Sequence, residues 1–336
     1  MTIQKTDTTI QSSIKLTNKN GMELVVNPFG ATIISLKVPN KNNQLTETIL
    51  SLNSEDEYYD ETFLKERIYL GSTVGRYAGR ISNKSFRIDD EVYELHHDNY
   101  NVHLHGGKNG FDRKMWAVKE VLENDDHSEL RLSYESKHLE EGYPGNLTVT
   151  ATFSLTNKNT VHIIYTAVSD RKTHVNLTNH NYYNLNEKGS ILEHKLRLNC
   201  DQYLEVDKNL IPSGNLLKVN STEYDYRKLK TIGENNFEGL DDTFIFNQNE
   251  NKIILSSDAS GIKMEVSTNQ PAVVIYTPLN FGHLNLKNGS SFSDYPGICF
   301  ETQKYPDTPN NINFPSTLLE PGKEYKNETV LTFSLL

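Results

Sequence analysis

Residues 147–155 read LTVTATFSL, and this stretch decides the fold class. Its apolar residues occupy every second position, and threonine or serine fills the positions between them. Successive side chains of a strand point to opposite faces, so this period is typical of a half-buried strand in an antiparallel sheet. The same alternation recurs in 130–134, 262–266 and 331–335. Further strands are predicted at 31–38, 161–167, 272–277 and 297–301.

Short polar segments separate neighbouring strand patterns, and they predict hairpins. Such segments lie at 89–91, 156–160 and 258–261. Helical patterns are scarce, and one short helix is expected to begin at Ser54, where Glu57 would complete a capping box. No proline- or serine-rich linker, charge run or repeat divides the chain. We therefore predict one all-β domain over residues 1–336, a large antiparallel β-sandwich with few short helices.

Composition narrows the class of partner. The 336 residues carry a formal net charge of −10, which argues against nucleic acid or an anionic membrane as the main partner and is compatible with a neutral small molecule. No segment approaches the roughly 20 apolar residues needed to span a bilayer. The first twenty residues lack the apolar core of a secretion signal, and two distant cysteines, Cys200 and Cys299, make no disulfide framework. A cytoplasmic protein is expected.

A glycine-rich segment at 71–81, GSTVGRYAGRI, does not look like a strand. It lacks the Gly-Lys-Ser/Thr of a phosphate-binding loop and the G-x-G-x-x-G spacing of a dinucleotide site. Arg76 and Arg80 could donate several hydrogen bonds to a ligand, and the alternative is a structural loop with solvated arginines.

A histidine-rich segment follows at 101–107, NVHLHGG, and His96 and His97 precede it. His103 and His105 are two residues apart, so a strand would aim both at one face. That is also the spacing of metal ligands, but a cupin-type site would want a glutamate soon afterwards, and residues 108–110 supply none. Structural histidines are the alternative.

Three more polar segments stand out. Residues 176–185, NLTNHNYYNL, combine amides and tyrosines around His180, and these groups can orient both a histidine and a hydroxylated ligand. Asp241 and Asp242 precede an apolar strand, as a turn would. Glu301 is expected at the end of the apolar strand 297–301, where a carboxylate is either paired or functional.

Taken together, the chain resembles the aldose 1-epimerase (galactose mutarotase) family over roughly residues 15–336. The resemblance is carried by the ordered set GRYAGRI (75–81), HLHGGKNGFDRKMW (103–116), NLTNHNYYNL (176–185), GLDDTF (239–244) and ETQKYPDTPNN (301–311). It implies a β-sandwich that interconverts the α and β anomers of a free hexose such as galactose or glucose, with no metal or cofactor. Two positions depart from the family pattern. Gly79 replaces the usual asparagine before Arg80, and Val274 stands where some members have a glutamine.

The resemblance also implies a role for each of five residues. Glu301 would be the general base and His180 the general acid, on opposite sides of the bond that breaks. His105 and Arg80 would hold the sugar near its ring oxygen and C1 hydroxyl, and Asp241 would bind distal hydroxyls. Ordinary pKa values suit this pair, because a carboxylate is charged at a pH where an imidazolium can still donate a proton.

Three alternatives stay open at this stage. A hexose 6-phosphate 1-epimerase would need a cationic pocket, for which Arg76 and Arg80 are candidates. A non-catalytic sugar-binding or sensing protein would bind without needing a proton-transfer pair. A cupin-like metal enzyme is the third. A monomer or homodimer is expected, and its partner is a small-molecule hexose.

Overall fold

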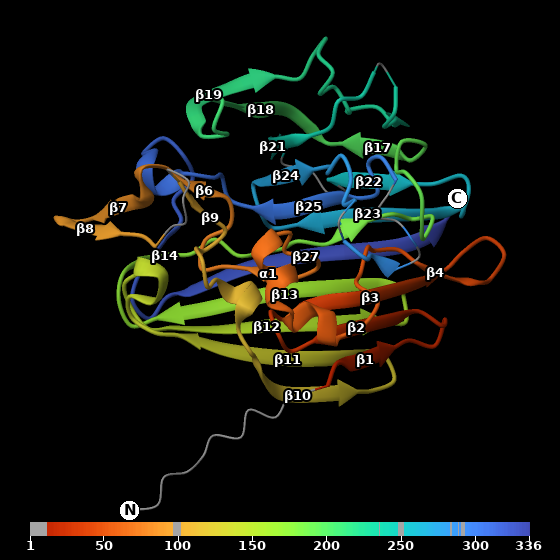
Figure 1. Cartoon of the computed structure of the whole chain (residues 1–336), viewed down its shortest axis with the longest axis horizontal. Helices are drawn as coiled ribbons and strands as arrows, with labels where there is room; N and C mark the ends of the chain where they lie inside the picture. The colour runs from red at the N-terminus through yellow and green to blue at the C-terminus, as the bar shows by residue number, and fades with distance from the viewer. Residues whose placement is uncertain are drawn as a thin grey trace, which may run out of the picture.

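Antiparallel β-strands make up most of the structure, a computed structural model that describes residues 12–96, 102–234, 236–247, 252–282, 284–287, 289 and 293–336. The largest sheet has nine strands in the order β10-β11-β12-β13-β27-β23-β22-β17-β20 (Figure 1). These strands are Ala117–Glu123 (β10), His127–Ser136 (β11), Leu147–Thr156 (β12), Thr160–Ser169 (β13), Glu324–Leu335 (β27), Ile262–Thr268 (β23), Ile253–Ser256 (β22), Lys195–Leu198 (β17) and Lys230–Thr231 (β20).

Two smaller sheets complete the body of the fold. The six-stranded sheet comprises Tyr182–Tyr183 (β16), Ile298–Gln303 (β25), Ala272–Tyr276 (β24), Asp241–Phe246 (β21), Cys200–Val206 (β18) and Pro212–Lys218 (β19), in that spatial order. The four-stranded sheet comprises Ile14–Thr17 (β1), Glu23–Asn27 (β2), Thr32–Pro39 (β3) and Leu45–Glu47 (β4).

The remaining described strands form four separate two-stranded ladders. They pair Thr173–His174 (β14) with Leu318–Leu319 (β26), Thr178–Asn179 (β15) with Thr73–Val74 (β5), Arg80–Ile81 (β6) with His103–Leu104 (β9), and Ser85–Ile88 (β7) with Glu91–Glu94 (β8). Figure 1 shows the β7–β8 hairpin projecting from the body of the fold. Single 3-10 turns lie at Asp56–Tyr59, Ser82–Lys84, Phe111–Arg113, Glu140–Gly142 and Thr308–Asn310.

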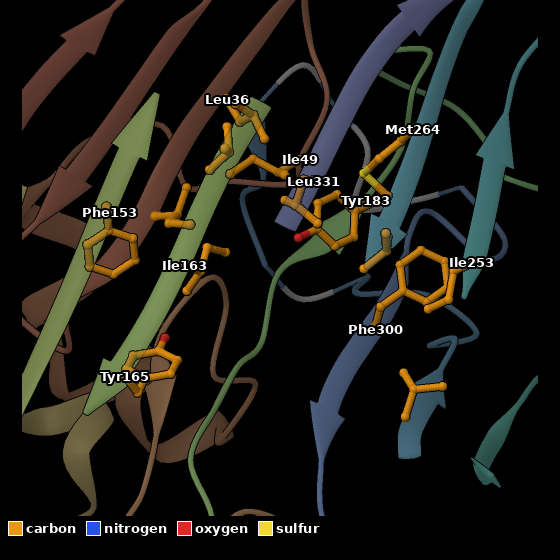
Figure 2. Close-up of a cluster of buried hydrophobic side chains, with 14 of the residues drawn as sticks. Leu36, Ile49, Phe153, Ile163, Tyr165, Tyr183, Ile253, Met264, Phe300 and Leu331 are labelled. Carbon is orange, nitrogen blue, oxygen red and sulfur yellow. The ribbon is translucent and has the colours of Figure 1, made fainter. Parts of the chain in front are cut away.

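One cluster of buried apolar side chains joins the three sheets. Figure 2 shows Phe153 and Ile163 of the nine-stranded sheet, Leu36 of the four-stranded sheet and Phe300 of the six-stranded sheet in this cluster. The alternating residues of 147–155 supply five of its members, because β12 turns its apolar face inward. The predicted all-β sandwich is thereby confirmed, and we propose that its shared core makes the chain a single domain.

The sequence predicted the long strands well and the helix poorly. All eight predicted strand segments and the three predicted hairpin turns lie where they were expected. The helix, by contrast, does not begin at Ser54. A 3-10 turn starts at Asp56, and α1 (Glu61–Glu66), the only α-helix in the described ranges, begins after Asp60, whose side chain accepts a hydrogen bond from the Thr62 N–H at 2.6 Å. Asp60 is the better cap because its backbone is extended, whereas Glu55, which precedes the 3-10 turn, is already helical.

Within the part of the chain that the structure describes, no helix is long and apolar enough to cross a membrane.

Candidate active site

Glu301 lies on β25, the second strand of the six-stranded sheet, and is almost completely buried, with 2 % of its surface exposed. The sequence predicted this residue at the end of its strand, but β25 continues to Gln303 because the polar residues after Glu301 are also buried in the sheet. Among the described residues, none hydrogen-bonds its Oε2 atom. A buried oxygen without a partner is costly, so this atom marks a place where a ligand can donate a hydrogen bond.

His180 lies beside Glu301, in the short link between β15 and β16. Its backbone is anchored twice, because its N–H donates to the Ser72 carbonyl and its carbonyl accepts from the Gly71 N–H, both at 3.0 Å. The Nε2 atom of His180 lies 3.5 Å from Oε1 of Glu301. The two residues of the predicted catalytic pair are therefore in direct contact.

His105 lies near the other carboxylate oxygen of Glu301. Strand β9 ends at Leu104, and His105 has a left-handed φ of 49°, so its side chain does not follow the alternation expected from His103. Its N–H donates to the Gly79 carbonyl at 3.0 Å, and the Gly79 N–H donates back to Nδ1 at 3.2 Å. Because Nδ1 accepts, neutral His105 carries its proton on Nε2. Its Nδ1 lies 4.0 Å from Oε2 of Glu301.

His103 and Arg76 do not join this site. His103 is fully buried, with Nδ1 against the His96 carbonyl and Nε2 2.8 Å from the Tyr143 hydroxyl. Arg76, 2 % exposed, donates to the carbonyls of Pro144 and Gly145 at 2.9 and 3.1 Å. The expectation that both histidines share one face was therefore wrong, as was the possible phosphate-binding pair of Arg76 and Arg80. His97 lies outside the described residues.

Arg80 and Asp241 form the outer part of the site. Arg80 comes from β6, and its Nη2 atom lies 3.7 Å from the Asp241 carboxylate at the start of β21. Both side chains are partly exposed, at 23 % and 34 %. Asp241 begins a strand and does not belong to a free turn, because it pairs in register with Tyr276.

A small pocket that opens to solvent, with a cavity volume of about 30 Å³, collects four of the five predicted residues. Its lining comprises Gly79, Arg80, His105, Val206, Leu210, Pro212, Asp241, Thr243, Val274, Glu301 and Pro306. His180 is not part of this lining; it contacts Glu301 and is 4 % exposed.

The two departures from the family pattern both lie in this pocket. Gly79 has a φ of 82°, and a Cβ atom added there would lie 3.1 Å from the Pro306 ring, so this loop favours glycine over asparagine. Val274 pairs with Glu301 across the sheet and places an apolar side chain beside the carboxylate.

Burial sets the charge states of the pocket. It raises the pKa of Glu301 to about 8, where the nearby Asp241 charge adds to the rise and Arg80 opposes it. It lowers the pKa of His180 to about 4 and that of His105 well below the usual range. Burial also raises the pKa of Asp241, against the pull of Arg80. The unliganded pocket therefore favours the neutral forms of both histidines and of Glu301.

Three residues could hold a metal ion. Atoms of His105, His180 and Glu301 that could ligate a metal lie within 4.8 Å of one another, and two histidines with a carboxylate suit zinc or iron. This set differs from the His103 and His105 pair that the sequence spacing suggested.

Sequence reasoning missed two residues of the site. The Cys299 sulfur lies 3.6 Å from Nδ1 of His180, and the Tyr69 ring packs against His105 with ring centres 4.7 Å apart. Cys299 could have been found, because it precedes Glu301 by two positions and therefore shares its face of the strand. Tyr69 carried no such signal.

Comparison with known proteins identifies the family of this chain. The aldose 1-epimerase family model matches residues 12–332. The chain is 38 % identical to the aldose 1-epimerase of Haemophilus influenzae, over 89 % of this chain and 88 % of that protein. It is 36 % identical to the galactose mutarotase of Homo sapiens, over 91 % and 90 %.

Solved structures of aldose epimerases also superpose on this chain. The galactose 1-epimerase of Lactobacillus acidophilus superposes with a TM-score of 0.85 at 31 % identity and covers 100 % of this chain and 98 % of that one. A GalM/aldose epimerase homologue from C. elegans superposes with a TM-score of 0.89 at 29 % identity, over 97 % and 99 %. The chain therefore belongs to the aldose 1-epimerase family. It is an isomerase that acts on sugars, and the resemblance predicted from the five motifs is confirmed.

Proposed function

We propose that the pocket interconverts the α and β anomers of a free hexose such as galactose or glucose, with Glu301 as general base and His180 as general acid. The observation that carries this proposal is the contact between the two side chains, 3.5 Å apart and buried, beside a carboxylate oxygen that no described residue hydrogen-bonds. Positioned proton transfer of this kind contributes about 10²–10⁴-fold per group.

The close contact of acid and base fits the chemistry. Ring opening removes a proton from the C1 hydroxyl, adds one to the ring oxygen and breaks the bond between C1 and that oxygen. Rotation about C1–C2 and reclosure then give the other anomer. Both reacting oxygens are bonded to C1, so the acid and the base need to reach neighbouring atoms and not opposite ends of a sugar. The sequence analysis had placed the two groups on opposite sides of the bond that breaks.

The pair needs one proton between its two members. Ordinary pKa values place that proton on the histidine, but in the buried pocket they are reversed and place it on Glu301. The proton count is the same in either state, so a sugar hydroxyl that hydrogen-bonds to the carboxylate can draw the pair into the carboxylate–imidazolium form. In the open-chain form the proton has moved from O1 to O5, and reclosure in the reverse sense returns a proton to O1 and restores the pair.

The remaining residues position the sugar. His105 presents an Nε2–H donor, which suits the ring oxygen or the C1 hydroxyl. Arg80 supplies further donors, and Asp241 accepts from distal hydroxyls. Because His105 lines the pocket and His180 does not, His105 is the rival candidate for the acid.

A neutral hexose suits the pocket better than a hexose 6-phosphate. Arg80 already faces the Asp241 carboxylate, and Arg76 points elsewhere. The test is a coupled assay of the purified protein on galactose, glucose and their 6-phosphates. Catalysed mutarotation of the free sugars is expected, with the phosphates at least tenfold poorer. Faster turnover of a 6-phosphate would replace the proposal, and sugar binding without turnover would favour the sensing protein.

We further propose a cytoplasmic protein that acts as a monomer or homodimer and needs no cofactor. Two free, buried cysteines, Cys200 and Cys299, support a reducing compartment.

A further inference from the structure

Cys299 contacts Nδ1 of His180, the ring nitrogen that the proposed reaction does not use. Its sulfur lies 3.6 Å from Nδ1 of His180, while Nε2 of the same ring lies 3.5 Å from Glu301. Cys299 and Glu301 are two residues apart on β25, so they project from the same face of the strand. One strand thus holds the imidazole at both nitrogens.

The surroundings restrict the imidazole further. Cys299 pairs in register with Tyr182, two residues after His180, which fixes the spacing between the two backbones. The rings of Tyr182, His105 and Tyr69 surround the imidazole, with centres 5.1, 5.5 and 5.7 Å from its own. The sulfur itself is fully buried. Both nitrogens therefore keep their partners.

We infer that Cys299 is a positioning residue, whose thiol engages Nδ1 of His180 and so dedicates Nε2 to proton exchange with the sugar. This inference rests on the proposed function and deepens it. When His180 releases its Nε2 proton, the neutral ring keeps its other proton on Nδ1, where the sulfur accepts it. Without a partner at Nδ1, the proton could occupy either nitrogen, and only one of the two tautomers is productive.

The weakness of sulfur as an acceptor matters for the chemistry. A carboxylate at Nδ1 would stabilise the imidazolium and hold its proton, whereas sulfur is a weak hydrogen-bonding partner. Burial raises the pKa of the Cys299 thiol well above its usual range, so it stays a neutral S–H and adds no charge. The proton on Nε2 therefore remains easy to release.

The chain contains a matched control. Cys200, on β18, is the other free buried cysteine, 2 % exposed, and it lies outside the pocket lining. Cys299→Ala and Cys200→Ala each remove one buried thiol from a strand of the same sheet. Cys299→Ser keeps a hydroxyl that can engage Nδ1.

The test measures mutarotation of α-galactose against pH for the three variants. Cys299→Ala is expected to lower kcat about tenfold with little change in KM, because the unproductive tautomer becomes populated. Cys299→Ser is expected to recover much of the rate, with the acidic limb of its pH profile moved upward, since oxygen stabilises the imidazolium better than sulfur does. Cys200→Ala should keep the wild-type rate and profile.

A second readout does not depend on activity. Nitrogen-15 NMR of the imidazole should show His180 with its proton on Nδ1 in the wild type and a mixture of tautomers in Cys299→Ala. An active wild type whose Cys299→Ala variant matches Cys200→Ala in rate, profile and tautomer would overturn the inference. An inactive wild type would instead contradict the proposed function.

Discussion

Two arginine–histidine pairs from the same two segments have opposite surroundings in this molecule. Arg76 and His103 lie in a cluster around Tyr143, where the guanidinium packs 5.6 Å from the tyrosine ring and donates to backbone carbonyls. Arg80 and His105 line a solvent-open pocket next to Glu301, which has an oxygen without a hydrogen bond from the described residues. The first pair stabilises the fold, and the second pair is arranged to receive a ligand.

The difference teaches how to separate structural from functional polar residues. The residue types are the same in both pairs and the sequence separations are similar, 27 and 25 positions, so they cannot distinguish the pairs. What differs is whether the protein itself supplies the hydrogen-bond partners. Substitutions around Tyr143 should therefore lower stability, and substitutions in the pocket should lower activity. Each of the following experiments can contradict that expectation.

The largest difference is expected between two histidines. His180→Asn should lower kcat by about 10²–10⁴-fold, because it removes the proposed acid. His103→Asn should leave kcat within about threefold of wild type while lowering the free energy of unfolding by about 1–3 kcal/mol, since the Tyr143 hydroxyl loses its buried partner. Polarimetry and urea unfolding measure the two effects. If His105→Asn loses far more activity than His180→Asn, the acid has to be reassigned to His105.

The arginines should divide in the same way, with a smaller effect on activity. Arg76→Met should lower the free energy of unfolding by about 2–4 kcal/mol, because several buried carbonyls lose a donor. Arg80→Met should raise KM about tenfold and change stability little, since that side chain is partly exposed. An Arg76→Met protein with normal stability would contradict the structural role of this residue.

The smallest expected effect is the dependence of kcat/KM on pH. The pair has one proton between about pH 4, below which His180 gains a second, and about pH 8, above which Glu301 loses the only one. We therefore expect kcat/KM to be flat in the middle of this range and to fall on both sides, after the uncatalysed rate is subtracted. A kcat/KM that keeps rising above pH 8 would show that the carboxylate alone is required.

The sequence predicted the sandwich because its strands carry the evidence locally. The alternation at 147–155 needs no knowledge of the rest of the chain, and β12 lies where that alternation placed it. The motifs predicted which residues form the site, but they did not predict the directions of the side chains. His105 leaves the alternation of His103 through a left-handed backbone, and Cys299 meets His180 across 119 positions of sequence. Neither backbone conformation nor long-range contact can be read from residue spacing.

The protonation of the pocket also lay beyond sequence reasoning. The ordinary pKa values of a carboxylate and a histidine are known from residue type, but burial reverses their order here. The prediction of a helix from Ser54 was wrong for a different reason, because Asp60 caps the α-helix that forms further along the chain.

The most direct test of the central claim is polarimetry on freshly dissolved α-galactose with Glu301→Gln. We expect kcat to fall by about 10³-fold or more, because the amide cannot accept the proton of the C1 hydroxyl. The protein should stay folded and become more heat-stable at pH 8. The folded protein favours protonated Glu301, so this carboxyl contributes most to stability below pH 4.5, and the contribution is lost as the pH rises through about 8. Glutamine stays neutral at every pH and avoids this loss. A folded Glu301→Gln protein that mutarotates galactose at near the wild-type rate would contradict the account.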